Sequence, residues 1–171
     1  VVQSEISLIN TARDIITKCH ISPDIYEFIY SPKTSAFYAI RILVVYISGG
    51  KIVEFVKQEF RNLFKVISMN RINSLSADSS TWILLLNGIL NSNLHFAEKL
   101  RWAKLSSSNP SNKQKRQLTK ILNNAHIVLG YGLSEYMRAS FQVLDVDSIK
   151  KDSILASVGK AAPNTKIAIR D

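Results

Sequence analysis

Strand-like and helical segments alternate along this chain, and this alternation limits its fold more than any other feature of the sequence. Some segments carry apolar residues at helical spacing, and short runs rich in β-branched and aromatic residues stand between them. The segments that read as strands are 25–30, 51–55, 72–77, 100–108 and 125–129, and the helical ones are 8–19, 36–50, 57–69, 80–90 and 111–122. Two later segments, 141–145 and 166–170, alternate like edge or antiparallel strands. The order predicts an α/β fold with a largely parallel sheet and flanking helices.

Length and composition place the chain among globular proteins. Its 171 residues suit one domain, 1–171, that can bury a core. Cys19 is the single cysteine, which excludes an intramolecular disulfide and fits a reducing compartment, so we expect a cytoplasmic protein. The longest apolar stretch, 36–50, is interrupted by Arg41 and is shorter than the roughly 20 apolar residues of a membrane-spanning helix. We therefore expect a helix buried within the domain and no membrane span.

The formal net charge of +9 permits binding to nucleic acid or to anionic lipid. The 22 Lys and Arg residues are spread along the chain, however, and only KQKRQLTK (113–120) is dense. That segment belongs to a helix that a capping box of Ser111 and Gln114 begins, and its cationic face is expected to be solvated. A nucleic-acid-binding function is the least favoured of the alternatives.

Two polar loops follow strands, SSSNPS at 106–111 and GYGLSE at 130–135. Ligands of parallel α/β sheets bind at the carboxyl ends of strands, so both loops are expected to border one site. In the second loop the Tyr131 ring could stack on a nucleobase, Ser134 could donate to a phosphate, and Glu135 could bind Mg²⁺. The alternative is structural: Tyr131 packs in the core, the glycines make a turn, and Glu135 is solvated or caps a helix.

The order of several motifs resembles the adenylate-forming superfamily, the AMP-binding acyl- and aryl-CoA synthetases and their relatives. GYGLSE is similar to the family's Y-G-x-[ST]-E motif, and it follows a strand, a polar turn and a helix, as the motif does there. SVGKAAPNTKIAIRD (157–171) resembles the family's downstream G-S-V-G-x-P-x-P-G-x-x-x-x-I-x-D pattern. Upstream, SEISLINTARDII (4–16) and SPKTSAFYAIRILVVYISGGKIV (31–53) are similar to two helices and a strand of the family. The resemblance thus spans 1–171.

The resemblance implies a partial N-terminal domain of an adenylate-forming ligase. Such an enzyme uses ATP to activate a carboxylic acid as an acyl-adenylate, and then transfers the acyl group to a thiol such as CoA. It implies that Tyr131 stacks on adenine, that Gly132 lines the adenine pocket, and that Ser134 and Glu135 act in catalysis. Ser134 would contact the AMP phosphate, and Glu135 would bind the magnesium of ATP. The turn that would border the adenine and the acyl group consists of Ser107, Ser108, Asn109 and Pro110.

The sequence also departs from the family pattern. The glycine-rich phosphate loop would precede Val1, and the Thr-Gly-Asp motif and the C-terminal domain with its catalytic lysine would follow Asp171. The family's Ser-Gly-Gly-Ala turn is Ser-Ser-Ser-Asn at 106–109, whose side chains are expected to narrow the space for adenine. We therefore expect a truncated relative whose chain alone is inactive. The alternative is a non-catalytic module that binds a protein partner, or oligomerises, through edges that truncation uncovers.

Overall fold

The structure is a computed structural model that describes residues 3–54, 63, 65–67, 71–92, 96–133, 135–163 and 165–168. These residues form a sheet with the strand order β2-β1-β3-β4-β5-β6-β7. The strands from β2 to β5 pair in parallel, whereas β6 and β7 are antiparallel to their neighbours. The predicted α/β fold with a largely parallel sheet is confirmed.

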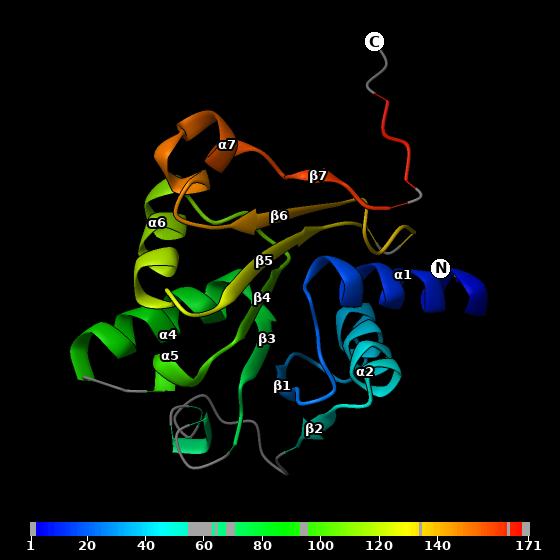
Figure 1. The fold of residues 1–171 in the computed structure, drawn as a ribbon, viewed down its shortest axis with the longest axis horizontal. Coiled ribbons are helices and arrows are strands. Elements are labelled where there is room, and N and C mark those ends of the chain that lie inside the picture. Colours follow the sequence, from blue (N-terminus) through cyan, green and yellow to red (C-terminus); the bar gives the residue numbers. More distant parts are fainter. Residues whose placement is uncertain are drawn as a thin grey trace.

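Helices cover both faces of this sheet. Figure 1 shows α1 and α2 on one side of the strands and α4 and α6 on the other. The strands are β1 (Tyr26–Tyr30), β2 (Lys51–Val53), β3 (Ser74–Asp78), β4 (Trp102–Ser106), β5 (His126–Tyr131), β6 (Ser140–Leu144) and β7 (Lys160–Ala161). The helices are α1 (Glu5–Lys18), α2 (Ala36–Ser48), α4 (Ser79–Ser92), α5 (Phe96–Lys99), α6 (Asn112–Ile121) and α7 (Asp152–Ala156), with a 3₁₀ turn at Ser148–Lys150.

The ends of α2 follow from the residues that flank it. The Ser35 hydroxyl accepts a hydrogen bond from the Tyr38 N–H at 3.0 Å, which satisfies one of the free donors of the first turn. The helix ends at Gly49, whose φ of 76° lies in the left-handed region that glycine adopts without strain. Because β1 leads into this helix, the first turn of α2 lies at the carboxyl edge of the sheet.

Alternation along the strands divides the core into two parts. In β4, Ala103 and Leu105 face the helices α4 and α6, whereas Trp102 faces α1 and α2. The polar ends of both indole rings are satisfied: Trp102 Nε1 donates to the carbonyl of Cys19 at 3.0 Å, and Trp82 Nε1 donates to the carbonyl of Lys104 at 3.0 Å. The sheet is therefore packed on both faces, and ligands have access to its edges.

The basic helix α6 begins as predicted but differs in one cation. Ser111 and Gln114 form the capping box, with reciprocal bonds between side chain and backbone. Lys115 is buried, which corrects the expectation of a solvated cationic face. Its ammonium donates to Gln142 Oε1 at 2.7 Å and to the carbonyl of Leu155, the next-to-last residue of α7. Burial lowers the pKa of Lys115, and the helix end it binds is where a cation is favoured.

The C-terminal part differs most from the prediction. No strand forms over 166–168 of the predicted segment 166–170, and its last two residues lie outside the described ones. Instead β7 pairs with β6 at Lys160–Ala161, and α7 precedes it, neither of which was predicted. Of the helix predicted over 57–69, residues 63 and 65–67 are helical, and the rest lies outside the described part of the chain. No helix of the described residues has the length and apolar character needed to cross a membrane.

Candidate functional site

The two polar loops meet, as predicted, because β4 and β5 are adjacent parallel strands. Leu105 pairs with Leu129 in the register of the two strands, so that both chains leave the sheet side by side. Two cavities open there, and they share the lining residues Ser106, Ser107 and Gly130. They are named here the Tyr131 pocket and the Arg138 pocket.

The Tyr131 pocket lies beside the predicted adenine contact. Its tyrosine side chain is 47% exposed, which contradicts the alternative of a ring packed in the core. Its volume is about 30 Å³, room for about two water molecules. An adenine ring can enter only if exposed side chains of the turn move aside. The other lining residues are Ser79, Leu105, Ser106, Ser107, Ser108, Asn109, Leu129, Gly130, Gln142 and Val158.

The first residue of α4, Ser79, is hydrogen-bonded to the turn that follows β4. Ser79 donates a hydrogen bond to the carbonyls of Ser106, at 3.1 Å, and Ser108. Ser107 has a φ of 72°, a left-handed conformation that is uncommon for a residue with a side chain. Pro110, the last residue of the predicted turn, is buried and does not line the pocket.

The Arg138 pocket is larger, at about 210 Å³, and reaches from the strand ends to the first turns of α2. Gly132 lines this pocket and not the Tyr131 pocket, although the resemblance implied a place beside adenine. A Cβ on Gly132 would lie 2.3 Å from the carbonyl oxygen of Met137, so only glycine allows the chain to fold back here. The remaining lining residues are Ala36, Phe37, Ile40, Ser106, Ser107, Gly130, Leu133, Met137 and Arg138.

Of the two predicted catalytic residues, Glu135 belongs to the described part of the chain. Glu135 is exposed and lines neither pocket, and its backbone carbonyl accepts a hydrogen bond from Gln3 Nε2 at 2.7 Å. Ser134 lies outside the described residues. Among the described residues, no three His, Cys, Asp or Glu side chains are grouped closely enough to hold a metal ion by themselves.

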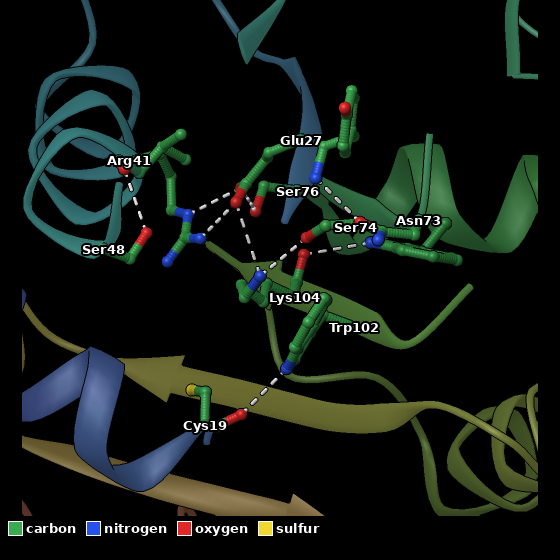
Figure 2. Close-up of polar contacts among 12 residues, drawn as sticks. Cys19, Glu27, Arg41, Ser48, Asn73, Ser74, Ser76, Trp102 and Lys104 are labelled. Carbon is green, nitrogen blue, oxygen red and sulfur yellow. Dashed lines mark hydrogen bonds and ion pairs between the residues drawn. The ribbon is translucent and has the colours of Figure 1, made fainter. Parts of the chain in front are cut away.

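A buried ionic cluster, which sequence reasoning missed, lies under α2 near the Arg138 pocket. The carboxylate of Glu27 on β1 accepts two hydrogen bonds from the guanidinium of Arg41, one of them from Nε at 2.7 Å. Lys104 on β4 approaches the same carboxylate at 3.4 Å and donates to Ser74 Oγ at 2.7 Å. Figure 2 shows these side chains converging, with the hydroxyl of Ser76 also directed at Glu27. We call Glu27, Arg41 and Lys104 the Glu27 cluster.

One carboxylate serves two cations in this cluster, and the pKa values follow from that. Burial opposes ionisation of Glu27, but the charges of Arg41 and Lys104 outweigh it and hold the pKa of the carboxyl at about 2. Burial and the charge of Arg41 lower the pKa of Lys104 to about 8, although the carboxylate of Glu27 opposes this shift. The signal in the sequence was one charged residue within each of three apolar elements. Sequence analysis noted Arg41, as an interruption of 36–50, and did not note Glu27 or Lys104.

Comparison with known proteins identifies the family. The sequence model of the AMP-binding enzyme family matches residues 1–171. No curated protein matches the sequence. Solved structures with the same fold include VinN in complex with L-aspartate (18% identity, TM-score 0.75), which covers 92% of this chain and 38% of VinN. Another is a luciferase-like enzyme from the mealworm Zophobas morio (17% identity, TM-score 0.76), with 94% of this chain and 38% of the enzyme covered.

A third similar structure is the amide bond synthetase McbA from Marinactinospora thermotolerans, with 13% identity and a TM-score of 0.81. The match covers 96% of this chain and 32% of McbA, so the chain spans 32–38% of the length of these three structures. At these identities the solved structures show a shared fold only. The family model, which matches residues 1–171, shows that the sequence is related to the family as well. The motifs around Tyr131, the sheet order and the sequence match agree, and the chain belongs to the family of AMP-binding enzymes.

Proposed function

We propose that this chain contributes the nucleotide and acyl pockets of an ATP-dependent ligase, which activates a carboxylic acid as its acyl-adenylate. One observation carries the proposal: two pockets adjoin at the carboxyl ends of β4 and β5 and share Ser106, Ser107 and Gly130. A reaction between two bound molecules needs adjacent sites whose reacting ends meet, and the shared wall provides such a meeting point.

In the proposed complex the adenine of ATP lies in the Tyr131 pocket. The exposed face of Tyr131 would stack on the base, while Ser107, Ser108 and Asn109 would border it. Ser134 is proposed as a phosphate donor on the strength of the motif alone. The carboxylic acid would occupy the Arg138 pocket with its reacting carboxylate toward Ser107 and Gly130.

The proposed first step forms a bond between a carboxylate oxygen of the acid and the α-phosphorus of ATP, and the bond from that phosphorus to pyrophosphate breaks. The contribution of this chain would be positioning, because the shared wall holds the two reactants at one edge of the sheet. In the proposed second step a thiol such as that of CoA takes the acyl group and AMP leaves, as the family resemblance implies.

Magnesium is implied by the family, and Glu135 fits it as one ligand of several. Its carboxylate is exposed, and among the described residues no hydrogen bond to it is found. Mg²⁺ in nucleotide sites is commonly held by one or two carboxylates, substrate phosphates and water, so a single side chain is a sufficient protein contribution. When bound, the ion would neutralise phosphate charge.

Calorimetric titration with AMP tests the nucleotide site. We expect Tyr131→Ala to weaken AMP binding by about 1–3 kcal/mol, the usual value of a base stacked on an aromatic ring. Tyr46→Ala is the matched control, because Tyr46 is 81% exposed near the end of α2 and lines neither pocket. Equal affinities for AMP in the native chain and Tyr131→Ala would remove the assigned pocket.

A non-catalytic module that binds a protein partner is the second candidate, and exposed apolar side chains on β6 and α7 favour it. Val143 and Ile154 are each about two fifths exposed and line a groove of about 540 Å³ between these elements. Analytical sedimentation with AMP titration separates the candidates. A monomer that binds AMP supports the ligase segment, and an oligomer that does not bind AMP supports the module.

A further inference from the structure

Arg138 lines the Arg138 pocket, but the proposed reaction assigns no role to its side chain. Its guanidinium lies against Gly130, where an added Cβ would be 2.7 Å from Nη1. Its Cζ lies 5.6 Å from the centre of the Phe37 ring. Gly130 and Phe37 both line the Arg138 pocket, so the guanidinium forms part of the wall. Among the described residues it has no hydrogen-bond acceptor and no ion-pair partner.

The positive charge around this wall exceeds the negative charge. A second cavity of about 10 Å³ shares Gly130 and Arg138 with the pocket and is also lined by Arg41 and Lys104. Arg41 is 1% exposed, and its Nη1 is buried without a hydrogen-bond partner. Glu27 is the one carboxylate that contacts these cations within the described part of the chain, and both Arg41 and Lys104 already use it. Three cations therefore face one anion.

Other carboxylates near Arg138 do not compensate this charge. Asp14 on α1 lines a neighbouring cavity of about 170 Å³ together with Arg138, but no ion pair joins the two residues. Burial raises the pKa of Asp14, and Lys18 is the cation that opposes this rise. Glu135 is exposed and lines none of the cavities described here. Since neither carboxylate pairs with Arg138, a ligand in the Arg138 pocket could supply the missing negative charge.

Arg138 is partly buried at the pocket wall. A partly desolvated cation without a counter-charge is unfavourable, and an anionic ligand would supply that charge. The planar guanidinium offers two parallel N–H donors to a carboxylate. Burial and the charge of Arg41 lower the pKa of Arg138 to about 10, so that it stays charged at neutral pH. The positive charge of Arg138 is therefore present at neutral pH, and an anionic ligand can pair with it.

We propose that the Arg138 pocket binds the second carboxylate of a short dicarboxylic acid. This rests on the proposed function, in which the first carboxylate is the one activated beside Ser107 and Gly130. The volume of about 210 Å³ favours a short chain, since pockets for drug-sized ligands measure about 300–1,000 Å³. The Phe37 ring and Ile40 would pack against the methylene groups between the two carboxylates.

Calorimetric titration of the chain with succinate, butyrate and sulfate tests the proposal. Succinate and butyrate have the same carbon chain and differ in one carboxylate, whereas sulfate has two charges and no chain. We expect succinate to bind roughly 10- to 100-fold more tightly than butyrate, the usual effect of one charge-assisted contact. In Arg138→Gln this preference should disappear, and in Arg138→Lys part of it should remain.

Arg13→Gln is the matched control, because it removes one charge from the exposed face of α1 and should leave the preference unchanged. Circular dichroism of each variant checks that it is folded. If Arg138→Gln does not fold, the comparison of succinate with butyrate in the native chain and in Arg138→Lys still decides the proposal.

AMP binding is measured in the same series, so that the two proposals fail separately. Binding of AMP without a preference for succinate over butyrate overturns the dicarboxylate and leaves the nucleotide site. A succinate preference that depends on Arg138, without AMP binding, supports the anion pocket and overturns the ligase function. Sulfate that binds as tightly as succinate overturns the dicarboxylate in favour of a simple anion site.

Discussion

The Glu27 cluster and the Arg138 pocket are neighbours that differ in how positive charge is compensated: Arg41 and Lys104 are buried, whereas Arg138 is partly buried. In the cluster, Arg41 and Lys104 lie out of water but share the carboxylate of Glu27, and Lys104 also donates to the hydroxyl of Ser74. In the pocket, Arg138 has an aromatic ring beside it and no anion among the described residues. Cations paired within the protein contribute to the fold, whereas a cation left unpaired at a cavity wall is available to a ligand. Substitutions in the two places should therefore have different effects on stability.

The largest expected effect is that of Glu27→Gln. This substitution leaves Arg41 and Lys104 buried without a counter-charge, and we expect it to lower the free energy of unfolding by about 3–5 kcal/mol. Urea denaturation measures the change. The control is Asp147→Asn, which breaks the exposed pair with Lys150 and should have a much smaller effect, because exposed ion pairs contribute little to stability. A similar small loss for both variants would show that the cluster does not stabilise the fold.

The next effect is the acid dependence of stability. The pKa of Glu27 is about 2 in the folded chain and 4.5 in the unfolded one, so the unfolded state binds the proton first as pH falls. The stabilisation is fully present above pH 4.5 and is lost as the pH falls toward 2, with a loss on the order of 3 kcal/mol. Urea denaturation at several pH values should show this loss. The same series on Glu27→Gln should show a weaker dependence, and equal slopes would contradict the assignment.

The smallest effect on stability is expected for Arg138→Gln. Arg138 is partly buried and no anion in the described residues compensates it. We therefore expect its removal to change the free energy of unfolding by no more than about 1 kcal/mol in either direction. The same variant should lose the preference for succinate. A loss of stability as large as that of Glu27→Gln would mean that Arg138 is a structural cation like Arg41, and the comparison would no longer hold.

The sequence was sufficient for the regular part of the fold. Hydrophobic periodicity and capping residues predicted β1, the helix α2 with its end at Gly49, and the capping box at Ser111 and Gln114. Each of these features is determined by residues that are close in the chain. They did not identify the pairing of β7 with β6, since a two-residue strand carries no periodic signal and depends on its neighbour. The buried Lys115 was missed for a similar reason, because its partner at the end of α7 is 40 residues away.

For the site, the sequence predicted which loops meet but not what lines them. Tyr131 and the turn from Ser107 to Asn109 share a pocket as expected, because parallel neighbouring strands end at one edge. Gly132 lies in the other pocket, because the chain folds back against Met137 after β5. Arg138 was not recognised, since its role depends on its having no ion-pair partner among the described residues, and only the three-dimensional arrangement can show this.

A crystal structure of the chain with AMP and succinate tests the central claim most directly, namely that the two pockets are halves of one site. We predict that the adenine ring stacks on Tyr131, with one carboxylate of succinate within hydrogen-bond distance of Arg138 and the other near Ser107. Both ligands bound away from the ends of β4 and β5, or Arg138 paired with a protein carboxylate while succinate lies elsewhere, would contradict it.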